Sequence, residues 1–137
     1  MTKNAIFPGS FDPFHEGHEF VVKAALEEFD LLYIIISWNE NKVRSYPFEL
    51  IFKKIKTKYQ DCPNIKILIN KNDLTTNMAK KLNCFNIVRG YRNDEDLKYE
   101  KELAQKYLLT ESRLNFFYYH HPKYKNISSS KLKNMLE

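Results

Sequence analysis

The sequence is poor in glycine and cysteine and has no long apolar segment. Only 3 glycines and 2 cysteines occur among 137 residues. Because Cys62 and Cys84 stand alone, without CxxC spacing, we expect a reduced, cytoplasmic protein. No apolar run approaches the roughly 18–20 residues of a membrane span. The run AIF within the N-terminal MTKNAIFPG is too short for a signal peptide, so we expect neither a membrane segment nor a secretory leader.

Long blocks of like charge are also absent, which argues against a basic tail. The net charge is +5. Such a balance fits a nucleic acid, a membrane surface or small anionic ligands as partners, and it fits equally well a general preference for lysine and asparagine. The length of 137 residues and the hydrophobic fraction of 43% predict a single domain, residues 1–137, that buries a core without disulfides or metal.

What the sequence does contain is an alternation of apolar runs and helical periodicities. Continuous apolar runs such as LLYIII predict buried strands, and apolar residues at helical spacing predict helices. The expected strands are residues 5–7, 31–36, 65–69, 85–88 and 114–119, and the expected helices are residues 18–29, 47–60, 75–82, 94–108 and 128–137. Strict alternation with short links predicts an α/β fold, a single Rossmann-like domain with a five-stranded parallel sheet and helices on both faces.

The glycines gather in the two loops where such a sheet places its ligands. In open parallel sheets, ligands bind outside the carboxyl ends of the strands, where the strand order reverses. The loops after the first and fourth strands are the usual candidates. Gly9 and Gly17 lie in FPGSFDPFHEGHEF (residues 7–20), and Gly90 lies in RGYR (residues 89–92). We therefore expect these two loops to form the ligand site.

The first loop combines its glycines with two histidines. Gly17 opens a predicted helix, where free N–H groups and the helix dipole favour an anion. His15 and His18 are three residues apart and face the same way, so their imidazoles can bind phosphate oxygens and stabilise charge during phosphoryl transfer. Two alternatives stay open, namely half of a zinc site completed by His120 or His121 and ordinary loop histidines. We expect no metal at these residues.

Other polar residues are placed to reach the same edge of the sheet. Arg89 and Arg92 flank the glycine of the second loop, and a planar guanidinium suits phosphate. Lys42 follows the second strand, although a single loop lysine is more often solvated than functional. Ser128–Ser130 open the last predicted helix, yet a serine run by itself is most often only a cap. Glu100, without further context, is a solvated helix residue.

These motifs resemble those of the nucleotidyltransferase superfamily with the HxGH motif, here His15-Glu16-Gly17-His18. Within that superfamily, the sequence is most similar to the phosphopantetheine adenylyltransferase family of bacterial coenzyme A synthesis. The similarity covers nearly the whole chain. It is carried by PGSFDPFHEGH, by Lys42 at its spacing, by RGYRNDEDLKYE (residues 89–100) and by ISSS (residues 127–130).

The resemblance implies that ATP and 4′-phosphopantetheine react to give dephospho-coenzyme A and pyrophosphate, with Mg²⁺ accompanying the ATP. It implies that the catalytic residues are His18, Lys42 and Arg92, with His18 stabilising the transition state at the α-phosphorus. It implies that the acceptor is bound by Ser10, Lys42, Arg89 and Leu74, the last on a looser match. The residues it implies for ATP are Ser10, Phe11, His18, Gly90, Tyr91, Arg92, Glu100, Tyr124, Lys125, Asn126, Ile127, Ser128, Ser129 and Ser130.

The residues agree with this chemistry. The acceptor phosphate is already a nucleophile at neutral pH, so the protein needs two anions held in line and cations to offset their repulsion, but no general base. The family usually has another residue at the position of His15, so we expect His15 to be non-essential. The family hexamer predicts a homo-oligomer, although its members commonly continue for a turn or two beyond the position of Glu137, which weakens that expectation.

Two alternative functions stay open. One keeps the fold and changes the acceptor to nicotinate or nicotinamide mononucleotide or glycerol 3-phosphate. Arg89-Gly90-Tyr91-Arg92 with Tyr99-Glu100 argues against it. The other is a non-catalytic, basic nucleic-acid-binding domain. It is disfavoured because the aromatic residues that would stack on bases lie on predicted core elements, namely Tyr46, Tyr59, Phe116 and Tyr118. We therefore expect ATP and 4′-phosphopantetheine as partners, and no nucleic acid.

Overall fold

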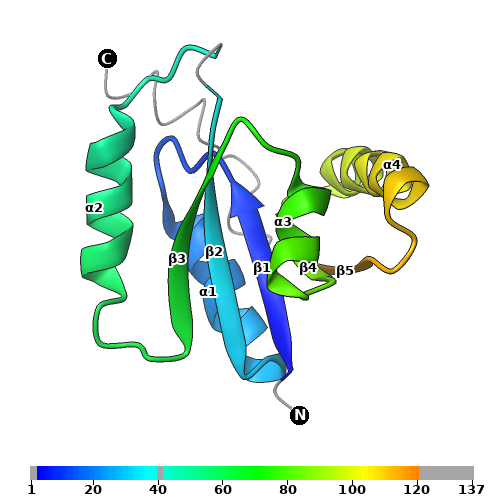
Figure 1. Cartoon of the computed structure of the whole chain (residues 1–137), viewed down its shortest axis with the longest axis horizontal. Helices are drawn as coiled ribbons and strands as arrows, with labels where there is room; N and C mark the ends of the chain where they lie inside the picture. Colours follow the sequence, from blue (N-terminus) through cyan, green and yellow to red (C-terminus); the bar gives the residue numbers. More distant parts are fainter. Residues whose placement is uncertain (1–2, 40–41, 121–137) are drawn as a thin grey trace.

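The computed structural model describes residues 3–39 and 42–120. Strands and helices alternate within these residues (Figure 1), in the order β1 (Asn4–Gly9), α1 (Glu16–Glu28), β2 (Leu31–Trp38), α2 (Phe48–Lys58), β3 (Ile65–Lys71), α3 (Thr75–Leu82), β4 (Asn86–Tyr91), α4 (Asp94–Thr110) and β5 (Asn115–His120). Every element predicted there is present, with its ends shifted by at most a few residues. The helix expected at 128–137 and the candidate ATP-binding residues Tyr124, Lys125, Asn126, Ile127, Ser128, Ser129 and Ser130 lie outside the described residues.

The strands form one parallel sheet in the order β3-β2-β1-β4-β5. All neighbouring pairs are parallel, and the β1–β2 register runs from Asn4 opposite Leu31 to Gly9 opposite Ile36. The chain moves outward from β1 through β2 to β3 and then returns to place β4 on the other side of β1. The strand order therefore reverses between β1 and β4, and the loops predicted to hold the ligand leave the sheet at this point.

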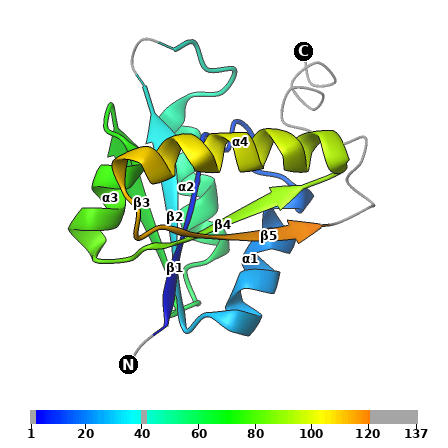
Figure 2. The same ribbon diagram turned by 90° about the vertical axis from the view of Figure 1, so that its right-hand side faces the viewer.

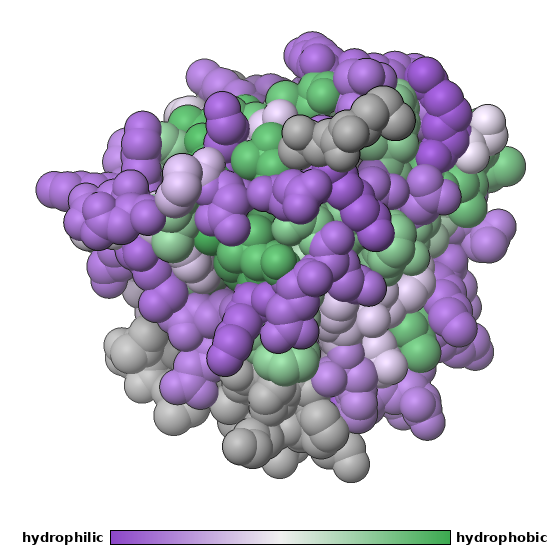
Figure 3. Space-filling view, turned by 90° about the horizontal axis from the view of Figure 1, so that it is seen from below, coloured by the Kyte–Doolittle hydropathy of each residue, from purple (hydrophilic) through white to green (hydrophobic). Residues whose placement is uncertain are grey.

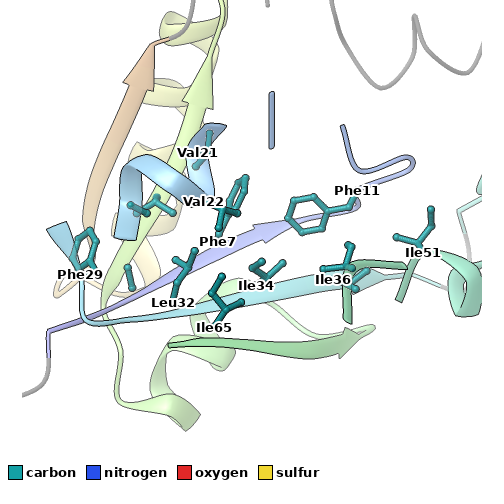
Figure 4. Close-up of a cluster of buried hydrophobic side chains, with 14 of the residues drawn as sticks. Phe7, Phe11, Val21, Val22, Phe29, Leu32, Ile34, Ile36, Ile51 and Ile65 are labelled. Atoms are coloured by element: carbon teal, nitrogen blue, oxygen red, sulfur yellow. The ribbon is translucent and has the colours of Figure 1, made fainter. Parts of the chain in front are cut away.

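Helices cover both faces of the sheet, as predicted. Figures 1 and 2 show α1 and α2 on one face and α3 and α4 on the other. Alternate residues of β2 face the two layers, because Leu32, Ile34 and Ile36 join the cluster under α1 and α2, whereas Ile35 joins the cluster under α3. Figure 4 shows the first cluster, which also contains Phe11 from the loop after β1. A strand buried on both faces explains the continuous apolar run of β2.

Gly90 lets β4 lie close to α1. A Cβ atom at this position would come within 2.6 Å of Cγ2 of Val21, a distance that side chains do not tolerate. The start of the following helix is fixed by Asn93, whose side chain accepts the N–H of Asp96 at 2.9 Å. The carboxylates of Asp94, Glu95 and Asp96 in the first turn favour the positive end of the α4 dipole. Together these features set the direction in which α4 leaves the sheet.

The end of the molecule where the strands begin is mostly hydrophilic, with smaller hydrophobic areas between the polar side chains (Figure 3). Within residues 3–39 and 42–120, no helix combines the length and apolar character needed to cross a membrane. Of the residues singled out from the sequence, Ser10, His15, His18, Lys42 and Arg92 lie at the opposite end of the molecule, where the strands finish.

Candidate active site

The loop after β1 and the first turn of α1 hold His18 in one orientation. His15 is the N-cap of α1, and its Nδ1 accepts the N–H of Gly17 at 3.0 Å. In return, the backbone N–H of His15 donates to Nδ1 of His18 at 3.0 Å, which completes a capping box. Because Nδ1 of His18 accepts a hydrogen bond, the proton of the neutral ring lies on Nε2. His18 therefore presents an N–H donor, whereas the N–H of Gly17, expected to be free for an anion, is taken by His15.

Aromatic rings surround the His18 imidazole. Phe14 stacks on it with ring centroids 5.3 Å apart, and Phe11 meets it edge-on at 5.0 Å. Burial, followed by the positive charges of His15 and Arg89, lowers the pKa of His18 well below its usual value of 6.5. His18 is therefore neutral at physiological pH, and its Nε2–H can serve a ligand as an uncharged hydrogen-bond donor.

The depressed pKa makes a prediction about stability. The His18 pKa is lower in the folded chain than in the unfolded chain, so the unfolded chain binds more protons once the pH falls below 6.5. We expect the free energy of unfolding to fall with pH in that range, by at most about 1.4 kcal/mol per pH unit and less where solvent reaches the ring. Urea titrations of the wild type and of His18→Gln between about pH 7.5 and pH 5 check it. Parallel curves for the two proteins would contradict the assignment.

Arg89 on β4 is held by three hydrogen bonds. Its Nε and Nη2 donate to the two carboxylate oxygens of Glu100 on α4, each at 2.9 Å. Its Nη1 donates to the carbonyl oxygen of Pro8 on β1 at 2.8 Å. The positive charge of Arg89 acts on His18, whose pKa it helps to lower. The structure thus joins Arg89, predicted to bind the acceptor, to Glu100, predicted to bind ATP, in one ion pair.

Arg92 lies beyond the end of β4 and pairs with Asp96 in the first turn of α4. Its Nη2 donates to Oδ1 of Asp96 at 2.9 Å, and its Nε donates to Oδ2 at 2.6 Å. Hydrogen bonds from Arg92 lower the pKa of the Asp96 carboxyl. After burial, the charge of Arg92 is the next largest cause of the lowered pKa of His15. Two arginines and two histidines therefore gather where β1 and β4 end.

Ser10 and Lys42 lie on the neighbouring loops. Ser10 follows β1 directly and is exposed, and Lys42 lies in the segment between β2 and α2. Within the described part of the chain, the Lys42 ammonium has neither a hydrogen-bond nor an ion-pair partner. Because β1 and β2 are neighbours, both residues are at the carboxyl edge of the sheet, and the lysine charge is available to a ligand.

Leu74 lines a cavity next to this edge. The cavity has a volume of about 300 Å³ and lies at the ends of β2 and β3, with walls formed by Ser37, Trp38, Asn39, Asn70, Asn72, Asp73 and Leu74. Leu74 itself is 61% exposed, although it is a large apolar residue. An exposed leucine at the mouth of a cavity can contact the chain of an elongated ligand.

Three further candidates, Phe11, Gly90 and Tyr91, lie among the described residues. Phe11 is buried, and its backbone has a left-handed φ of 49°, so the side chain anchors the loop while the main chain turns outward. Tyr91 at the end of β4 stacks on His120 of β5, with ring centroids 4.9 Å apart. Gly90 is needed for packing against α1, as described above, so its glycine character has a structural cause that is independent of any nucleotide.

Two residues at this edge were not predicted. Asp12 is buried, and its carboxylate accepts the N–H of Ser45 at 2.8 Å and that of Tyr46 at 2.9 Å. Arg44 donates from Nη2 to the carbonyl oxygen of Ser10 at 2.8 Å. Asp12 lies within the first-loop motif, but its hydrogen-bond partners lie more than thirty residues away in the chain, so the sequence does not indicate them. Arg44 carries no sequence signal that separates it from other loop arginines.

Comparison with known proteins now identifies the family. A cytidylyltransferase-like family model matches residues 6–135. Phosphopantetheine adenylyltransferase of Mycoplasma mycoides subsp. mycoides is 45% identical over 98 residues, which cover 72% of this chain and 70% of that protein. The protein of the same name from Lactobacillus gasseri is 37% identical over 134 residues, which cover 97% and 80%. The chain belongs to the phosphopantetheine adenylyltransferase family, within the cytidylyltransferase-like proteins.

Solved structures agree on the fold. The bifunctional NMN adenylyltransferase/ADP ribose pyrophosphatase of Francisella tularensis, complexed with AMP and a manganese ion, superposes with a TM-score of 0.66 at 18% identity. The match covers 98% of this chain and 41% of that one. Both the family and the predicted Rossmann-like fold are confirmed, and the family consists of nucleotidyltransferases.

The histidines offer little to a resident metal. Nδ1 of His15 and Nδ1 of His18 both accept backbone N–H groups, so Nε2 of each neutral ring carries the proton and has no lone pair for a metal. Within residues 3–39 and 42–120, no three His, Cys, Asp or Glu side chains are grouped so as to hold a metal ion. The absence of zinc stays a prediction, and elemental analysis of the purified protein checks it, since stoichiometric zinc would contradict it.

Proposed function

We propose that the chain transfers the adenylyl group of ATP to 4′-phosphopantetheine and so forms dephospho-coenzyme A and pyrophosphate. The observation that carries the proposal is the gathering of Arg89, Arg92 and a neutral His18 at the reversal of the strand order, in a family of nucleotidyltransferases. Bringing together two polyanionic substrates requires guanidinium groups and fixed hydrogen-bond donors of this kind.

In the proposed mechanism, a phosphate oxygen of the acceptor attacks the α-phosphorus of ATP and pyrophosphate leaves. No general base is needed, because this oxygen is already ionised at neutral pH. His18 donates Nε2–H to an α-phosphate oxygen as charge develops there. Arg92 neutralises the departing pyrophosphate, and Lys42 is the third residue that we assign to catalysis. Mg²⁺ arrives as part of the MgATP substrate.

The two substrates occupy different parts of the edge. We assign the acceptor phosphate to Ser10, Lys42 and Arg89, and the arm of the acceptor to the cavity beside Leu74. ATP lies across the ends of β1 and β4. Its proposed contacts are Ser10, Phe11, His18, Gly90, Tyr91, Arg92 and Glu100, together with Tyr124–Ser130. Because both carboxylate oxygens of Glu100 accept hydrogen bonds from Arg89, Glu100 acts on ATP through the position of α4 or after that pair opens.

The position of the enzyme in the cell and its assembly are further parts of the proposal. A reduced cytoplasm suits a chain whose two cysteines are unpaired, with Cys84 buried and Cys62 partly buried. We infer a homo-oligomer from the family, and sedimentation velocity of the purified protein tests this inference, since a monomer across the working concentration range would contradict it.

The decisive test is a pyrophosphate-release assay with a matrix of substrates. ATP and CTP are each offered with 4′-phosphopantetheine, nicotinamide mononucleotide, nicotinate mononucleotide or glycerol 3-phosphate. We expect release with ATP and 4′-phosphopantetheine alone. Pyrophosphate release with a mononucleotide, or with CTP and glycerol 3-phosphate, would show that the acceptor is a different one, while nucleotidyl transfer would stand. Inactivity with every pair, combined with salt-dependent RNA binding, would favour the non-catalytic alternative.

A further inference from the structure

The segment that carries Lys42, residues 42–47, is tied to the loop after β1 through a buried carboxylate. This segment contains neither helix nor strand. The two oxygens of Asp12 accept the backbone N–H groups of Ser45 and Tyr46 at 2.8 and 2.9 Å. Asp12 is 3% exposed, so water competes little for these charged hydrogen bonds. The Asp12 carboxylate therefore fixes the end of the segment against the loop that contains Ser10.

Arg44 makes a second connection at the same place. Its Nη2 donates to the carbonyl oxygen of Ser10 at 2.8 Å, and its Nη1 donates to that of Ser37 on β2 at 3.2 Å. The guanidinium lies over the ring of Phe48, with Cζ 5.6 Å from its centroid. One side chain thus joins the loop after β1, the end of β2 and the start of α2. The planar fork of the guanidinium donates to the two carbonyl oxygens from two different nitrogens.

We propose that Asp12 and Arg44 are positioning residues that hold Lys42 beside Ser10, where the acceptor phosphate binds. This inference rests on the proposed function. Lys42 is two residues before Arg44, and its own side chain is exposed and unpaired within the described residues, so its reach is set by the backbone that Asp12 and Arg44 hold. Lysine has a long, flexible stem, and fixing its backbone lowers the entropy that is lost when the phosphate is bound.

A double-mutant cycle separates this role from direct contact with substrate. We expect Arg44→Ala to raise the KM for 4′-phosphopantetheine by about tenfold, the loss of roughly one hydrogen bond to a charged group, and to leave the KM for ATP within about twofold. In a Lys42→Ala background the same change should have almost no further effect, because Arg44 acts through Lys42. Additive effects would show that Arg44 acts independently of Lys42, and they would overturn the proposal.

Two further variants test whether the effect comes from the hydrogen bonds of Arg44 or from its charge alone. Arg44→Lys keeps the charge but replaces the two donor nitrogens of the fork with a single nitrogen on a flexible stem, so we expect it to behave like Arg44→Ala. Full rescue by lysine would mean that charge alone matters, and it would overturn the positioning role. Arg113→Ala is the matched control, because Arg113, like Arg44, lies over a phenylalanine ring, that of Phe85 at 4.2 Å, but it pairs with the Glu111 carboxylate at the other end of the sheet. We expect it to leave both KM values unchanged.

Amide hydrogen exchange measures how firmly residues 42–47 are held, independently of catalysis. The amides of Ser45 and Tyr46 should exchange at least about tenfold faster in Arg44→Ala and in Asp12→Asn than in the wild type, because the bonds that protect them are weakened. Unchanged exchange in Arg44→Ala would overturn the positioning role while the proposed function stands. A wild-type protein that releases no pyrophosphate with 4′-phosphopantetheine would instead overturn the proposed function, and with it the acceptor role assigned here.

Discussion

Replacing His18 with alanine is expected to lower kcat by about 10²–10³-fold while the KM values for both substrates change little. The reason is geometric. The backbone N–H of His15 holds Nδ1 of His18, so the imidazole presents Nε2–H in a fixed direction and needs no reorientation as charge grows on the α-phosphate. A donor that is used mainly in the transition state contributes to kcat rather than to ground-state binding. Steady-state pyrophosphate release, measured against each substrate in turn, checks this result.

The neighbouring His15 provides the matched control. Its side chain caps α1 through Gly17, but the bond that orients His18 comes from its backbone, which His15→Ala retains. We expect a loss of about 1 kcal/mol in stability, as for removal of an N-cap, and a much smaller fall in kcat than for His18→Ala. Equal losses of kcat in the two variants would mean that the roles of the two histidines are wrongly divided.

The fold could be predicted because its determinants are local in the sequence. Each strand is an apolar run and each helix a periodic one, and their strict alternation allows few topologies other than a parallel sheet covered on both faces. The predicted place of the site rests on the same argument, since glycines and cations are concentrated in the loops after β1 and β4. The continuous apolar run LLYIII likewise predicts that β2 is buried on both faces.

The contacts within the site depend on packing, which the sequence does not display. The Arg92–Asp96 pair is separated by one helical turn and is the kind of contact that spacing alone suggests. The Arg89–Glu100 pair joins a strand to a helix, and it exists only because α4 crosses β4 at that level. Likewise, the capping box that orients His18 uses a histidine as N-cap, which residue preferences do not favour.

The Arg89–Glu100 pair leads to the second large effect, which concerns stability as well as binding. The Glu100 side chain is 11% exposed, and Arg89 supplies two hydrogen bonds to it. Arg89→Ala would leave this carboxylate nearly buried and unpaired, so we expect the free energy of unfolding to fall by about 3 kcal/mol. Adding Glu100→Gln removes the stranded charge and should restore part of this loss. Urea titrations of the single and double variants measure both effects.

Ligand binding by the same variants tests which substrate each arginine serves. Removing Arg89 should weaken the binding of 4′-phosphopantetheine by about 1.5–3 kcal/mol, as for the loss of a hydrogen bond to a charged group. The affinity for ATP should be nearly unchanged. Arg92→Ala should show the reverse pattern, because its guanidinium is assigned to the pyrophosphate of ATP. Calorimetric titration at a temperature where all variants are folded makes the comparison. The Glu100→Gln change should restore part of the stability lost in Arg89→Ala but not the affinity for the acceptor, since the phosphate loses the guanidinium in both the single and the double variant. If both arginine variants lowered the affinity for ATP alone, the assignment of Arg89 to the acceptor phosphate would be wrong. Arg89 would then belong to the nucleotide site with its partner Glu100.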